Sequence, residues 1–151
     1  MNCSAEQWIA QARHLFGREK PEHFTDYNHC DECYEHDQTL LQWDIDTISL
    51  QQLGNPGWDP LCFCSSAGKQ YYMPALIRLT LASMQSDFYL EQLLFHLQID
   101  GEDNDFYRSC NTEQRQFVAE FLAHLVEEYS HQVEQMSCSD DLLQAHQIWN
   151  R

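Results

Sequence analysis

The stretch NTEQRQFVAEFLAHLVEEY, residues 111–129, carries the longest helical pattern of the chain. Its large apolar side chains recur every three or four residues and therefore share one face of a helix. These residues are Val118, Phe121, Leu122, Leu125 and Tyr129. Asn111 or Thr112 has the side-chain chemistry of a helix N-cap. The stretch predicts a long amphipathic helix that buries this apolar face.

Helical patterns also occur on the N-terminal and C-terminal sides of this stretch. Ser4 and Gln7 have the spacing of a capping box, which predicts where the first helix begins. With the long helix included, five or six helices are expected. The others should cover about 4–17, 31–43, 74–84, 87–97 and 139–149. We expect the core to form around Leu93, Leu94, Phe121, Leu122 and Leu125.

Residues 61–72 favour the one β element of the chain. Cys62–Cys64 and Gln70–Tyr72 flank the small and polar residues 65–69, as two short strands flank a hairpin loop. Pro74 then stands where the first position of a helix is expected. The predicted fold class is therefore α+β, predominantly helical, with one small β-hairpin and one domain over residues 1–151. The alternative is an all-α bundle with an irregular insert.

The chain is strongly acidic, with 24 Asp and Glu against 8 Lys and Arg and a formal net charge of −16. Such a charge repels phosphate groups, because nucleic-acid affinity rests largely on Lys and Arg. DNA, RNA and anionic membranes are therefore excluded as expected partners. The same field favours a basic protein as partner. The alternative is that the acidity serves solubility alone.

No stretch approaches the roughly 18 apolar residues of a membrane-spanning helix, and no secretion signal is recognisable at the N-terminus. We therefore expect a cytoplasmic protein. Seven cysteines in a reducing compartment indicate metal ligands, redox-active thiols or thiols packed in the core.

The segment HCDECYEH, residues 29–36, is the densest cluster of candidate metal ligands. Cys30 and Cys33 have the Cys-x-x-Cys spacing that can direct two sulfur atoms at one ion, and His36 could be the third ligand. One straight helix can hardly supply four ligands, so Cys62 or Cys64 is expected to complete the site. The predicted ion is Zn²⁺, and the sulfur atoms of the two segments should then lie close together.

Two other interpretations of these cysteines remain open. In one, Cys62 and Cys64 are ordinary core residues and the other thiols bind nothing. In the other, Cys30 and Cys33 form a redox-active dithiol, which requires Cys30 to lie near a helix N-terminus that stabilises its thiolate.

Three segments together resemble a group of small bacterial proteins of unknown function. Their residues are HCxECxEHD at 29–37, GNPGWDPxCF at 54–63 and YYMPAL at 71–76. The resemblance covers about residues 15–97 and implies no established activity. It supports treating residues 29–76 as one unit.

Two functions of different classes follow from these observations. The first is a small accessory or interaction protein with a structural zinc site at residues 29–64 and an acidic surface for a basic partner, for example a toxin that it neutralises. The second is a metal-dependent hydrolase whose ion keeps a position open for water, with Glu32 or Glu35 as base. Four protein ligands would indicate the first, and three ligands plus water in a cleft the second.

Overall fold

The computed structural model describes residues 4–151, and over this range it is helical without a β-strand. It has nine α-helices and three short 3-10 helices, η1 to η3. The α-helices are α1 (Ala5–Phe16), α2 (Asp31–Gln42), α3 (Leu50–Leu53), α4 (Ser66–Ala82), α5 (Leu90–Gln98), α6 (Asp105–Ser109), α7 (Thr112–Glu128), α8 (Ser130–Gln135) and α9 (Ser139–Trp149). The 3-10 helices are η1 (Pro56–Trp58), η2 (Pro60–Phe63) and η3 (Gly101–Asp103).

Capping residues set the starts of the helices that the sequence predicted best. Ser4 and Gln7 form a reciprocal capping box at α1, and Asn111 and Gln114 form another at α7. Each box satisfies two backbone N–H groups that a helix otherwise leaves without partners. The predictions of helices near 4–17, 31–43 and 139–149 and of the long helix after Asn111 are confirmed.

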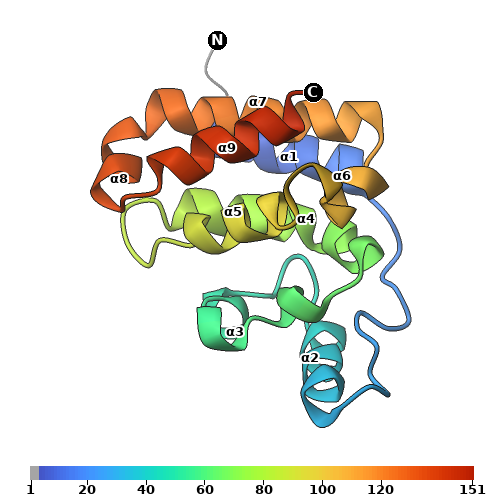
Figure 1. Cartoon of the computed structure of the whole chain (residues 1–151). Helices are drawn as coiled ribbons and strands as arrows, with labels where there is room; N and C mark the ends of the chain where they lie inside the picture. Colours follow the sequence, from blue (N-terminus) through green and yellow to red (C-terminus); the bar gives the residue numbers. More distant parts are fainter. Residues whose placement is uncertain (1–3) are drawn as a thin grey trace.

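The longer helices lie in two layers above a smaller third part (Figure 1). The upper layer contains α7, α8 and α9, and α1 packs against both α7 and α4. Below it lie α4 and α5, and α5 also packs against α9. The predicted core residues Leu93, Leu94, Phe121, Leu122 and Leu125 are all buried between these layers. The chain between α1 and α4, which includes α2 and α3, forms the lower part.

The predicted β-hairpin is wrong. Residues 60–63 form η2, and residues 66–82 form one continuous helix, α4. Ser65 is the N-cap of α4, where its Oγ accepts a hydrogen bond of 3.1 Å from the backbone N–H of Gly68. A Cβ at Gly68 would collide with the Cys64 sulfur and the Phe24 ring. Gly68 is therefore needed for close packing in the first turn of a helix, and not for a hairpin loop.

The helix count also differs from the predicted five or six. Pro74 lies inside α4 instead of at its start, at the cost of one backbone hydrogen bond. Short helices also appear outside the expected ranges: Asn104, for example, caps α6 directly after residues 100–103, three of which are acidic. The fold is thus all-helical, as in the alternative of an all-α bundle, and the predicted α+β class is corrected.

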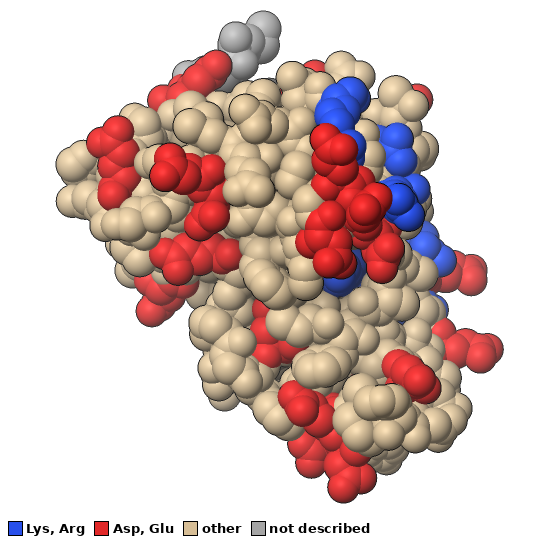
Figure 2. All heavy atoms as spheres, viewed as in Figure 1, with Lys and Arg blue, Asp and Glu red and all other residues tan. Residues whose placement is uncertain are grey.

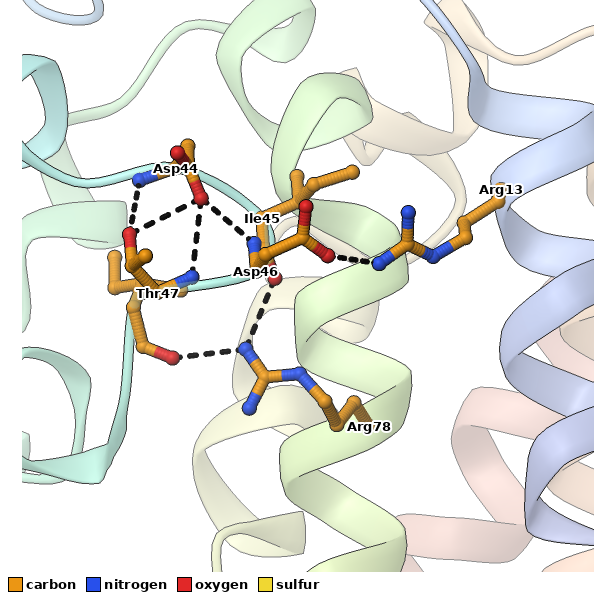
Figure 3. Close-up of polar contacts among 7 residues, drawn as sticks. Arg13, Asp44, Ile45, Asp46, Thr47 and Arg78 are labelled. Carbon is orange, nitrogen blue, oxygen red and sulfur yellow. Dashed lines mark hydrogen bonds and ion pairs between the residues drawn. The ribbon is translucent and has the colours of Figure 1, made fainter.

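The turn that follows α2, residues 43–49, forms polar contacts with α4 and α1 of the layers above (Figure 3). Nη2 of Arg78, on α4, donates to the carbonyl oxygens of Ile45 and Ile48 at 2.9 and 2.8 Å. Asp46 forms an ion pair with Arg13 of α1. The turn itself is closed by Asp44, whose Oδ1 accepts backbone N–H groups within the turn.

The C-terminal end of α2 is held by two buried or half-buried side chains. Nζ of Lys20 donates to the carbonyl oxygens of Leu41 and Trp43 at 2.5 and 2.6 Å. The hydroxyl oxygen of Tyr72 lies 2.5 and 2.8 Å from the carbonyl oxygens of Leu40 and Trp43, which share its one proton. These bonds satisfy carbonyl groups that a helix end leaves free. They fix the C-terminal end of α2 beside α4. The N-terminal end of α2 points away from the layers (Figure 1).

Charged residues are distributed unevenly over the face seen in Figure 2. Acidic side chains occur over both the helical layers and the lower part, whereas the Lys and Arg side chains gather along one edge. In residues 4–151 no helix combines the length and apolar character that a membrane crossing needs.

Candidate functional site

The loop before α2 is folded back along the helix by one buried carboxylate. Oδ1 of Asp37 accepts the backbone N–H groups of Phe24 at 2.6 Å and Thr25 at 3.2 Å. Its Oδ2 lies 2.7 Å from Nδ1 of His23. The hydroxyl of Thr25 in turn donates to the carbonyl oxygen of Cys33 at 2.6 Å. These contacts define the path of the chain that delivers His29 and Cys30 to the start of α2.

Cys30 is the N-cap residue of α2. Its Sγ accepts the backbone N–H of Cys33 at 3.4 Å, and the two sulfur atoms are also 3.4 Å apart. Nδ1 of His29 lies 3.7 Å from Sγ of Cys33. Cys30 and His29 are exposed and Cys33 is buried. Cys30 is thus accessible to solvent, whereas Cys33 is not.

The two thiols differ in acidity. The hydrogen bond from the Cys33 backbone, together with the His29 and Cys33 side chains, lowers the pKa of Cys30. The bond to the Cys30 thiolate and then burial raise the pKa of Cys33. The Cys30 thiolate also raises the pKa of His29. A thiolate at a helix N-terminus is stabilised by the free N–H groups and the helix dipole, so Cys30 is the more acidic thiol of the pair.

This arrangement allows two kinds of chemistry. The ligand atoms of His29, Cys30 and Cys33 lie within 4.8 Å of one another, so the three residues could hold a metal ion. Alternatively, the two sulfur atoms could close a disulfide, because a shift of little more than an ångström brings them to the bond length of about 2.05 Å. All six cysteines among residues 4–151 are free thiols, and Cys3 lies outside the described residues.

His36, a predicted ligand, does not join this group. Its ring is fully buried and lies against the rings of Trp58 and Phe63, with centroid distances of 4.4 and 5.1 Å. Neither ring nitrogen has a hydrogen-bond partner, and Oε1 of Glu32 is 3.5 Å from Nε2. In this position His36 contributes to the contact between α2 and the 3-10 helices η1 and η2.

Cys62 and Cys64 are also placed elsewhere. Cys64 is buried beneath Gly68, and this burial raises its pKa to about 12. Cys62 is exposed and shares a second group of possible ligands with Asp59 and His96. Within residues 4–151 no group of neighbouring ligand atoms joins Cys62 or Cys64 to the pair in α2. The structure therefore brings together Cys30 and Cys33, but not the full predicted set.

Three residues of these groups were absent from the predicted ligand set. His29 directly precedes Cys30 in the sequence, and this position could have identified it as a candidate ligand. His96 stands among leucines in α5, where a buried polar side chain needs a partner. Asp59 precedes Pro60, a combination typical of a helix start. Nothing in the sequence pairs Asp59 with His96, because 37 residues separate them.

Five hollows between helices lie away from the group His29, Cys30 and Cys33, which is called the α2 site below. The most spacious of them, about 610 Å³, runs between α1 and α7 beside Trp8 and Phe117. None of the five is lined by His29, Cys30 or Cys33. The three residues therefore border none of these hollows.

The comparisons with curated proteins and with solved structures found no match. The comparison with family models matches residues 19–151, a range that includes the α2 site and all helices after α1. The chain belongs to the Family of unknown function (DUF6714).

Proposed function

We propose that this chain is a small dithiol protein that exchanges the thiols of Cys30 and Cys33 with a disulfide of a partner. The observation that carries the proposal is the position of Cys30 as the N-cap of α2, with its sulfur 3.4 Å from that of Cys33. Exposure and a lowered pKa suit Cys30 to attack, whereas burial suits Cys33 to a second, intramolecular step. A metal ligand pair needs no such asymmetry.

The exchange proceeds in two steps. The Cys30 thiolate attacks one sulfur of the partner disulfide, a Cys30–partner disulfide forms, and the other partner sulfur leaves as a thiolate that takes up a proton. Cys33 then loses its proton and attacks the sulfur of Cys30. The Cys30–Cys33 disulfide forms, and the second partner thiol is released. The partner disulfide is thereby reduced by two electrons and the pair in α2 is oxidised by two.

The test uses two matched variants that each remove one thiol of the pair. With a small-molecule disulfide such as oxidised glutathione, Cys33→Ser should accumulate a mixed disulfide at Cys30, because the second step is lost. Cys30→Ser should not accumulate one at Cys33, which is buried. Mass spectrometry of the intact chain detects both products. Equal labelling of the two variants, or an unchanged dithiol in the natural chain, would refute the proposal.

A zinc site is the second candidate, and His29 is the observation that favours it. Zinc binds Cys sulfur at about 2.3 Å and His nitrogen at about 2.0–2.1 Å, usually with tetrahedral geometry. Donors on one such ion are separated by about 3.5–3.8 Å, which agrees with the 3.7 Å between His29 and Cys33 and is close to the 3.4 Å between the sulfur atoms. The protein would then be an accessory protein in which the ion fixes the start of α2.

Three protein ligands leave one position for water, so the hydrolase hypothesis is linked to the same site. The α2 site borders none of the five hollows described above, and we therefore place hydrolysis behind the other two functions. Metal analysis of the untagged protein, with thiol titration before and after chelation, separates the candidates. Bound zinc should protect both thiols from alkylation until the chelator removes it, whereas the dithiol protein should contain no metal.

The charge of the chain suggests the kind of partner. With 24 acidic against 8 basic residues, the surface attracts cationic proteins. We propose that the disulfide partner is a basic protein. The rate of mixed-disulfide formation with a cationic disulfide peptide should then fall as salt is added, and the rate with an anionic peptide should rise.

A further inference from the structure

A second group of chemically active side chains lies where η2 meets α5. Asp59 is the N-cap of η2, and its Oδ1 accepts the backbone N–H of Leu61 at 2.9 Å. Its Oδ2 lies 2.8 Å from Nε2 of His96 and accepts Nε2 of Gln92 at 3.0 Å. Asp59 and His96 are buried. The carboxylate is thus held in a fixed orientation by one backbone group and two side chains.

Cys62 completes this group at the protein surface. Its sulfur, a carboxylate oxygen of Asp59 and a ring nitrogen of His96 lie within 4.8 Å of one another. Cys62 is exposed, in contrast to Asp59 and His96. The group therefore has a buried side with oxygen and nitrogen donors and a solvent-facing side with a sulfur donor.

Asp59 is a buried carboxylate without a Lys or Arg partner among the described residues. A buried carboxylate is costly unless a positive charge or several hydrogen bonds compensate it. Within residues 4–151 the ion-pair partner of Asp59 is His96, and no Lys or Arg pairs with it. The buried Asp37 has a similar environment, with two backbone N–H groups and a ring nitrogen of His23 as partners. Hydrogen bonds, and not a Lys or Arg, thus compensate both carboxylates.

A buried hydroxyl at the start of α5, the helix that carries His96, also lacks a partner. Tyr89 is fully buried, and its hydroxyl makes no hydrogen bond within the described chain. Burial is the main reason why the pKa of Tyr89 is raised, and the charges of Asp59 and Cys62 add to it.

We propose that Asp59, Cys62 and His96 form a binding site for one zinc-like divalent cation, independent of the site in α2. Oxygen, nitrogen and sulfur donors together suit a borderline-soft ion such as Zn²⁺, and not Mg²⁺ or Ca²⁺, which prefer oxygen donors. Three protein ligands leave the fourth position to water.

Binding requires a small change in the spacing of Asp59 and His96, and the Cys62 sulfur must come within zinc-ligand distance from its present position within 4.8 Å of both. An oxygen and a nitrogen on the same tetrahedral ion are about 3.3–3.5 Å apart, so Asp59 and His96 must separate by about half an ångström from their present 2.8 Å. The ion replaces the hydrogen bond between them. Gln92 remains bonded to the carboxylate and to the carbonyl oxygen of Leu53, and so supports the ligand from outside.

The experiment uses the full chain with Cys30→Ser and Cys33→Ser, so that the α2 site cannot contribute thiolates. This protein should bind one Co²⁺ or Zn²⁺ in equilibrium dialysis, and Co²⁺ should give a thiolate-to-metal absorption band. Adding Cys62→Ser should abolish the band and weaken binding by more than about tenfold, since even residues behind the ligands are worth roughly 10–100-fold. Cys64→Ser is the matched control, because it removes a thiol two residues away and should leave the band unchanged.

Folding is checked by circular dichroism for each variant, and the exposed position of Cys62 makes its replacement mild. No bound ion in the folded Cys30→Ser/Cys33→Ser protein would overturn this proposal, and so would a cobalt band that survives Cys62→Ser. Neither result bears on the dithiol function, which is tested in chains that retain Cys62.

Discussion

Replacing Arg78 by Met tests whether the turn after α2 is held mainly by one side chain. The change keeps much of the aliphatic length of the side chain but removes both hydrogen bonds from Nη2, to Ile45 and Ile48. A hydrogen bond to a charged group contributes about 1.5–3 kcal/mol. The contacts are half-buried, so water can partly replace the lost donor, and we expect a total loss of about 3 kcal/mol in the free energy of unfolding.

The assay is urea unfolding followed by circular dichroism, with a thermal scan in parallel. For a chain of this size, about 3 kcal/mol corresponds to a decrease of roughly 6–12 °C in Tm. Arg13→Met is the matched control: it removes the ion pair with Asp46, whose two side chains are 46% and 62% exposed. Such a pair contributes about 0–1 kcal/mol. Equal losses of unfolding free energy in Arg78→Met and Arg13→Met would refute the reasoning. Burial would then not determine how much such a contact contributes to stability.

Three further predictions concern single side chains. Burial raises the pKa of Cys64 from 9.0 to about 12, so its thiol ionises first in the unfolded chain and its contribution to stability falls as pH rises from about 9. Between pH 8 and pH 10 the natural chain should therefore lose roughly 1 kcal/mol more in urea unfolding than Cys64→Ala, in which the other buried thiols titrate unchanged. His36→Leu removes two unpartnered buried nitrogens and should leave the urea midpoint unchanged or higher, whereas a large loss would mean that the imidazole has a partner. Asn111→Ala should cost about 1 kcal/mol through loss of the α7 cap, and Thr112→Ala, the control, much less; similar losses would contradict the cap assignment.

The helix ends were predictable where the signal is local. A capping box involves residues three apart, so Ser4 and Gln7 identify the start of α1 without knowledge of the fold. The same local signals failed at residues 61–72, because the role of Gly68 depends on its contacts with Cys64 and Phe24. A glycine required by packing and a glycine required by a turn look the same in a sequence.

The candidate site was predictable in part for a similar reason. Cys30 is the N-cap of α2 and Cys33 lies in its first turn, so a spacing of three residues is enough to bring the sulfur atoms together. The partners of Asp59 come from α5, which lies more than thirty residues further along the chain. Composition and periodicity say which residues are buried, but not which buried residues from distant segments meet. His96 could be recognised as unusual from the sequence, and its partner could not.

The direct packing of α1 on α4 affects the free energy of local opening in the segment between them. These helices flank residues 17–65, so the segment that carries α2 is a closed loop whose two ends are held together by the layers. Its release therefore needs no separation of α1 from α4, so the packing between the layers is not lost when the segment opens. Amide hydrogens of α2 should accordingly exchange with deuterium at a lower opening free energy than those of α4 or α7, and thiol reagents should reach buried Cys33 through the same openings.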